Sequence, residues 1–172
     1  MKKVITLVAA AIVVSGGASN AAQAADFSFS VGQTSESTTT YRFGTQFDFN
    51  KSWLQSDVGR LTGYWDGAYT YWDGDDTSSN HSISLAPVFV YEFAGENFRP
   101  YVEAGIGIAF FSSTEIENND LSTSFQFEDR IGAGVRFANQ EVGIRAIHYS
   151  NAGIKNPNDG VESYALHYRL SF

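Results

Sequence analysis

Cysteine is absent from this 172-residue chain, and proline occurs only three times. Without cysteine the chain has no disulfide framework and no thiolate nucleophile. Basic residues are also few, with 11 Lys and Arg against 19 Asp and Glu. The net charge of −8 argues against a nucleic-acid partner, because phosphate binding requires clustered Lys and Arg. The three histidines show no metal-ligand spacing, so we expect no metal site.

Long hydrophobic runs are missing as well, except at the start of the chain. Met1-Lys2-Lys3 precedes an apolar stretch from Val4 to Val14, and small residues follow as far as Ala25. This is the layout of a secretory signal peptide, and the apolar stretch is too short to span a bilayer. We expect residues 1–24 to be cleaved and residues 25–172 to form a single domain.

From Tyr41 onward apolar and polar residues alternate. Tyr41, Phe43 and Phe47 fall on one face of an extended chain, and Arg42 and Gln46 on the other. Residues 125–137 repeat the pattern, with an apolar face interrupted only by Asp129 and a second face of charged residues and glycine. A narrow membrane barrel needs this combination, because paired charges and small residues fill its lumen while lipid contacts its outer face.

Similar patterns place eight strands, at about 26–32, 39–50, 57–72, 81–94, 98–112, 122–138, 141–150 and 161–172. Longer polar connections alternate with shorter links, as outer loops alternate with periplasmic turns in bacterial barrels. The ending Tyr168-Arg169-Leu170-Ser171-Phe172 resembles the C-terminal signal of outer-membrane barrels. We therefore expect an all-β fold, an eight-stranded antiparallel transmembrane β-barrel in the bacterial outer membrane. A soluble periplasmic barrel, such as a lipocalin-like carrier, is the alternative.

The lumen of this barrel is expected to hold charged residues that pair with one another, since pairing offsets the cost of burial. The residues are Glu92, Glu103, Glu128, Arg130, Arg136 and Arg145. They are expected to set stability rather than activity.

Three polar residues fall on the apolar, outward-facing side near the outer rim, namely His148, Ser150 and Glu162. If the loop 151–160 closes a symmetric hairpin, residues whose numbers sum to about 310 face one another, which pairs His148 with Glu162. Ser150 lies two residues above His148, about 7 Å away along the strand. An imidazole can bridge such a span between a hydroxyl and a carboxylate.

This order of groups predicts an acyl-transfer triad. Glu162 fixes the tautomer of His148, His148 takes the proton of Ser150, and Ser150 attacks a carbonyl. The oxyanion requires hydrogen-bond donors, for which Asn151 is the first candidate, followed by Asn158 and the amides of the residues after Asn151. Alternatively, the three side chains are ordinary residues of the membrane interface, and water satisfies their hydrogen bonds.

The segment His148-Tyr149-Ser150-Asn151-Ala152-Gly153-Ile154, followed by residues 158–162, resembles the active-site region of the lipid A 3-O-deacylases. The resemblance implies His148, Ser150 and Glu162 as the triad, Asn151 as a residue important for activity, and no cofactor. It also implies hydrolysis of the ester-linked 3-hydroxyacyl chain at position 3 of lipid A, the lipid part of lipopolysaccharide, in the outer leaflet. We expect outward-facing residues such as Ala146, Tyr164 and Leu166 to form a groove for this chain.

Two other functions stay open at this point: a non-enzymatic barrel in adhesion or envelope integrity, and a lipid A palmitoyltransferase. The sequence is compatible with a homodimer but carries no feature that indicates one. His81 and His167 have no evident Ser and carboxylate partners, so we expect both to be structural. The acidic run Asp73-Gly74-Asp75-Asp76 is expected to be a solvated outer loop rather than a cation site.

Overall fold

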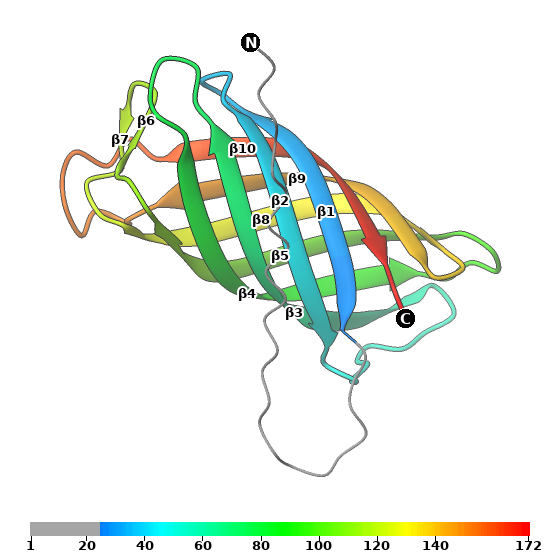
Figure 1. Cartoon of the computed structure of the whole chain (residues 1–172). Coiled ribbons are helices and arrows are strands. Elements are labelled where there is room, and N and C mark those ends of the chain that lie inside the picture. The colour runs from blue at the N-terminus through cyan, green and yellow to red at the C-terminus, as the bar shows by residue number, and fades with distance from the viewer. Residues whose placement is uncertain (1–24) are drawn as a thin grey trace, which may run out of the picture.

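The computed structural model describes residues 25–172 as one sheet closed into a β-barrel (Figure 1). The predicted signal peptide, residues 1–24, lies outside the described residues. Eight long strands form the barrel: β1 (Asp26–Thr34), β2 (Thr39–Asp48), β3 (Gly59–Asp73), β4 (Asn80–Phe93), β5 (Arg99–Phe111), β8 (Phe125–Phe137), β9 (Gln140–Ser150) and β10 (Val161–Leu170). No helix in the described part of the chain has the length and hydrophobicity needed to cross a membrane.

The predicted strands are confirmed, because the two-residue alternation marks each of them over most of its length. One element was not predicted: two short strands, β6 (Glu115–Ile116) and β7 (Asn119–Asp120), pair as a small hairpin between β5 and β8. This stretch was expected to be a polar connection. Two residues per strand are too few for an alternation to show.

The strands pair antiparallel with their neighbours, and β1 pairs with β10 to close the barrel. Closure leaves no unpaired sheet edge, which is the condition for a sheet to cross a membrane. The loops after β1, β3, β5 and β9 lie at one end, which we call the outer end by analogy with bacterial barrels.

The outer face of the barrel is apolar. Large hydrophobic side chains on every long strand are exposed, among them Phe43, Ile83, Ile106, Ile131 and Leu166. A soluble barrel would cover these side chains or replace them with polar ones, because exposed apolar patches of this extent lead to association. The exposed surface therefore favours the membrane barrel over the soluble carrier.

Ion pairs fill the middle of the lumen, where the six predicted charged residues are all buried. Arg130 lies 2.6 Å from both Asp66 and Glu128, and Arg42 lies 2.8 Å from Asp66 and 3.0 Å from Glu128. A second group joins Arg145 to Glu103. These pairs link strands that are distant in the sequence, so they fix the cross-section of the barrel.

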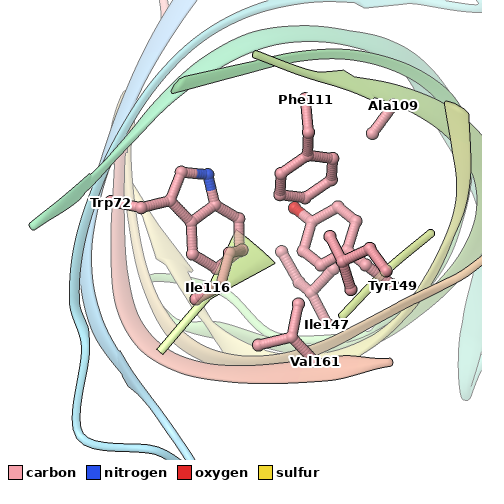
Figure 2. Packing of buried hydrophobic residues seen from close by; sticks show 8 residues of the cluster. Trp72, Ala109, Phe111, Ile116, Ile147, Tyr149 and Val161 are labelled. Atoms are coloured by element: carbon pink, nitrogen blue, oxygen red, sulfur yellow. The ribbon is translucent and has the colours of Figure 1, made fainter. Parts of the chain in front are cut away.

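An apolar cluster closes the lumen at the outer end. Trp72, Phe111 and Tyr149 pack edge to face or tilted, with ring centroids 5.2–5.4 Å apart. Ile116 of β6 and Leu121, which directly follows β7, are buried among these rings. Figure 2 shows the labelled side chains pointing into the space that the strands enclose. The hairpin is thereby anchored in the mouth of the barrel.

We expect the buried ion pairs to be necessary for stability once the barrel is built around them. Arg130→Ala leaves Asp66 and Glu128 with an uncompensated buried charge and should lower the free energy of unfolding by about 3–5 kcal/mol. Urea titration of the protein folded in detergent measures the change. Arg60→Ala is the control: Arg60 is 47% exposed beside Glu92, and its loss should cost less than about 1 kcal/mol. Equal losses in the two variants would contradict this role of the lumen network.

Candidate active site

His148 and Glu162 face each other on the outer wall of the barrel. The register of β9 and β10 pairs them directly, as the sequence predicted. His148 Nδ1 lies 2.9 Å from Glu162 Oε1, and the two side chains are 41% and 42% exposed. The carboxylate therefore holds one ring nitrogen of the imidazole and leaves Nε2 as the nitrogen able to take a proton from another group.

Ser150 is the last residue of β9, on the same face as His148 and one pleat nearer the outer end. Its partner on the neighbouring strand is Phe127 of β8. Among the described residues the Ser150 hydroxyl has no hydrogen-bond partner, so it is not committed to a structural contact. Sites of this kind often form the nucleophile–base hydrogen bond only when the substrate is present.

A tight turn follows Ser150 immediately. Ala152 and Gly153 both have positive φ, 51° and 78°, and the Ile154 N–H donates to the Asn151 carbonyl over 3.1 Å. This is the backbone of a turn with two left-handed central residues, as in type I′. Within residues 25–172 the Ala152 and Gly153 N–H groups donate to no protein acceptor. They are free donors beside the serine.

The side chain of Asn151, the first candidate for the oxyanion donor, is engaged in hydrogen bonds within the protein. Its Nδ2 donates to the carbonyls of Leu121 and Lys155 over 3.0 and 2.9 Å, so both amide hydrogens are used. Asn151 is fully buried and fastens the loop, and the geometry leaves its amide no donor for an oxyanion. That Asn151 is required for activity stays a prediction. The reason is now that Asn151 holds the loop in place.

The Asn158 side chain uses its amide oxygen within the loop but not its amide nitrogen. Its Oδ1 accepts the Asn151 N–H over 2.9 Å, which fixes the orientation of the amide. Its Nδ2 group has no acceptor among the described residues. The Asn158 side chain therefore keeps donor hydrogens that the Asn151 side chain lacks, although the sequence had favoured Asn151.

A groove runs along the outer wall from His148 and Glu162 across β9, β8, β5 and β4. Its volume is about 850 Å³, and most of its lining is apolar, including Phe89, Ala104, Ile106, Ile131, Ala146 and Tyr164. The expected groove residues Ala146 and Tyr164 are there, whereas Leu166 is not part of the lining. The groove has the dimensions and chemistry for an acyl chain.

Asp129 is the one carboxylate in the groove besides Glu162, and sequence analysis gave it no role. It is exposed on the outward face of β8, where the register places it beside His148 on one side and Ile106 on the other. A carboxylate facing lipid is costly, so its presence indicates a function. The signal was visible in the sequence as the single interruption of the apolar face of residues 125–137.

His167 was expected to lack Ser and carboxylate partners, and this was wrong. Ser30 Oγ lies 3.1 Å from His167 Nδ1, and Glu141 Oε1 lies 3.1 Å from Nε2. The set is a second Ser-His-Glu constellation, but it points into the lumen, where His167 has no exposed surface. No ester can reach it, so His167 is structural for a reason other than the one expected. His81 lies on the surface, hydrogen-bonded through Nδ1 to the Tyr69 hydroxyl.

Among the described residues, no three potential ligands are arranged to hold a metal ion. The acidic loop after β3 instead directs backbone N–H groups at a carboxylate: Asp75, Asp76 and Thr77 all donate to Glu117.

Comparison with known proteins gives matches over the whole barrel. Residues 38–171 match the family described as Lipid A 3-O-deacylase (PagL). The chain is 56% identical to the lipid A deacylase PagL of Pseudomonas aeruginosa, over 99% of both chains. It is 39% identical to the lipid A deacylase PagL of Bordetella bronchiseptica over 109 residues, which cover 62% of this chain and 60% of the relative.

Among solved structures, the crystal structure of the outer membrane enzyme PagL superposes with a TM-score of 0.83 at 58% identity, covering 86% of this chain and 99% of that one. The family match at residues 38–171 includes all the strands that carry the outward-facing pair and the groove. Because both the family match and the identity to a full-length relative span most of the sequence, this chain belongs to the lipid A 3-O-deacylase family and is an outer-membrane enzyme.

Proposed function

We propose that this protein hydrolyses the ester-linked 3-hydroxyacyl chain at position 3 of lipid A in the outer leaflet, through a Ser150–His148–Glu162 triad on the lipid-facing side of the barrel. The observation that carries the proposal is the His148–Glu162 hydrogen bond at the head of an apolar groove on the outer wall. A lipid can enter such a groove from the membrane without leaving the bilayer. The family to which the chain belongs supports the same substrate.

The reaction proceeds in two steps through an acyl-enzyme. Ser150 Oγ attacks the ester carbonyl and passes its proton to His148 Nε2, while Glu162 stabilises the imidazolium through Nδ1. Collapse of the tetrahedral intermediate releases the sugar hydroxyl, which takes the proton from His148. Water, deprotonated by His148, then attacks the acyl-enzyme and releases the free hydroxy fatty acid. The reaction as proposed needs neither a metal nor a cofactor.

Negative charge on the carbonyl oxygen is stabilised by donors in the loop that follows Ser150. The Asn158 amide is held by the Asn151 N–H, so its Nδ2 group is oriented before substrate binds. The free N–H groups of Ala152 and Gly153 are the second source of donors. Fixed donors of this kind stabilise the transition state without reorganisation.

Replacing the triad residues should abolish lipid A deacylation. Ser150→Ala and His148→Ala should each lower kcat by about 10⁴-fold or more, because members of a triad act as a unit. Mass spectrometry of lipid A incubated with the folded variants measures the loss of the 3-hydroxyacyl group. Ser30→Ala is the matched control, since Ser30 has the same kind of His and Glu neighbours inside the lumen, and it should remain active. Full activity of Ser150→Ala would remove Ser150 from the mechanism.

Asn158 can be tested with two substitutions that separate its two roles. Asn158→Asp keeps an acceptor for the Asn151 N–H but removes the donor, and should lower kcat by about 10²–10³-fold. Asn158→Ala removes both the acceptor and the donor, and its kcat should be at least as low. Steady-state kinetics with a soluble ester or lipid A measures both variants. An active Asn158→Asp would assign the oxyanion to the backbone donors alone.

Asp129 is placed to recognise the hydroxyl group of the acyl chain. Asp129 and His148 are direct neighbours on adjacent strands, so their Cβ atoms lie about 5 Å apart. A 3-hydroxyacyl chain bears its hydroxyl two carbon atoms from the ester carbonyl. An acyl chain that runs from Ser150 into the groove therefore brings this hydroxyl to Asp129. The carboxylate can accept a hydrogen bond from the hydroxyl.

Asp129→Ala should weaken the preference for hydroxylated chains. The loss of kcat/KM should be about 10-fold or more for a 3-hydroxyacyl ester and small for an unsubstituted ester of equal length, because a hydrogen bond to a charged group is lost only in the first case. Ile131→Ala, in the same groove, should affect both esters alike. Equal losses for the two esters in Asp129→Ala would show that Asp129 does not recognise the hydroxyl.

The two alternative functions differ from this one in the mass of the product. A palmitoyltransferase would add palmitate to lipid A, and a non-enzymatic barrel would leave it unchanged. The free donors beside Ser150 and the groove beside His148 favour an enzyme over a non-enzymatic barrel, and the family match favours hydrolysis over transfer. A homodimer stays a prediction without support, and the triad and groove proposed here lie within one chain.

A further inference from the structure

The segment between β5 and β8, residues 112–124, folds back over the outer end of the barrel. We call this segment the strap. It contains the β6–β7 hairpin and lies beside the loop between β9 and β10, residues 151–160 (Figure 1). The strap carries none of the residues of the triad or of the groove.

Several contacts hold the strap itself in place. Ile116 and Leu121 are 2% and 0% exposed in the apolar cluster at the barrel mouth. Glu117 accepts the N–H groups of Asp75, Asp76 and Thr77 in the loop after β3. Desolvation raises the pKa of Glu117, but these three hydrogen bonds outweigh it and the pKa lies below its ordinary value. Apolar packing in the barrel mouth and hydrogen bonds to the loop after β3 therefore both hold the strap in place.

The strap in turn holds the active-site loop at both of its ends. Leu121 accepts the amide of Asn151 at the beginning of the loop. At the far end, Asn119 Nδ2 donates to the Gly160 carbonyl over 2.9 Å, and the Asp120 N–H donates to Asp159 Oδ2 over 2.9 Å. The backbone at Gly160 is therefore fixed by a side chain 41 residues earlier in the sequence.

Gly160 lies against the catalytic histidine. It is buried with φ of 68°, and a Cβ on it would lie 3.0 Å from His148 Cε1 and 3.7 Å from Nε2. These two atoms form the ring edge that ends in Nε2, the nitrogen not used in the Nδ1–Glu162 hydrogen bond. Glycine restricts its own backbone less than any other residue, so the orientation of the Gly160 peptide depends on an external partner.

We propose that Asn119 is a positioning residue for His148, acting through Gly160. This inference rests on the proposed function, since it takes His148 as the base. The Glu162 carboxylate fixes the imidazole at Nδ1, and the Asn119–Gly160 hydrogen bond fixes the backbone against which the Cε1–Nε2 edge of the ring packs. A small displacement of a catalytic group lowers the rate by up to about 100-fold. The loss of a hydrogen bond remote from the reacting atoms can therefore lower kcat.

Asn119→Asp and Asn119→Ala test the proposal, because both remove the donor to Gly160. A fluorophosphonate that labels Ser150 gives the concentration of competent sites, and kcat is expressed per labelled serine. We expect kcat per site to fall about 10–100-fold, with KM within about 2-fold of wild type. Asn118→Ala is the matched control: the neighbouring asparagine is exposed and should leave kcat unchanged.

A purely structural strap would give the opposite pattern, with fewer labelled sites but an unchanged kcat per site, and that result would overturn the proposal. Gly160→Ala disturbs the same contact from the other side and should also lower kcat per site. Because the two residues act through one contact, the double variant Asn119→Ala/Gly160→Ala should lose much less than the product of the single losses. Multiplicative losses would also overturn the proposal. Activity that survives in Ser150→Ala would instead refute the proposed triad, and this inference with it.

Discussion

Closure of a hydrogen-bonded sheet is the constraint on which the rest of this structure depends. In the bilayer every backbone N–H and C=O must find a partner within the protein, and only a closed barrel allows strands to satisfy this requirement. Pairing of β1 with β10 completes the ring. Once the register is fixed around the ring, each residue is committed to the lumen or to the lipid face, and the positions of His148 and Glu162 relative to each other follow from backbone pairing alone.

The small number of strands explains why the site lies outside the barrel. A ring of eight strands has room only for side chains, and here ion pairs and an apolar cluster occupy that room. Acyl chains cannot enter it. The same packed lumen makes the barrel wall rigid, and a rigid wall suits catalytic groups that stand on strands, because their backbone positions vary little. The parts of the site that do not stand on strands, namely the turn after Ser150 and Gly160, require the additional support that the strap supplies.

Much of the fold and the central pair could be predicted because both obey local rules. A period of two marks strands, and the symmetry of one short hairpin brought His148 to Glu162. What the sequence could not show depends on contacts between distant segments. Ser30 and His167 meet only through the closing pair of strands, 137 residues apart. The roles of Asn151 and Asn158 are set by which amide hydrogens the loop and strap consume, and no spacing in the sequence encodes this. Asp129 was visible as an anomaly, but its meaning required the register that places it beside His148.

The two Ser-His-Glu sets in this chain show that such a constellation is defined by its surroundings as much as by its distances. In the lumen, Glu141 also forms ion pairs with Arg136 and Arg169, and His167 is inaccessible to any substrate. That set stabilises the barrel because all of its members are satisfied by one another. On the outer wall, the His148–Glu162 pair is two-fifths exposed, Ser150 has no partner in the described chain, and the groove opens toward lipid. The unsatisfied hydroxyl and the free donors beside it are what a reacting ester can use. A shift of one residue in the register would exchange the two faces, so the pairing that closes the barrel also decides which of the two sets can act on a lipid.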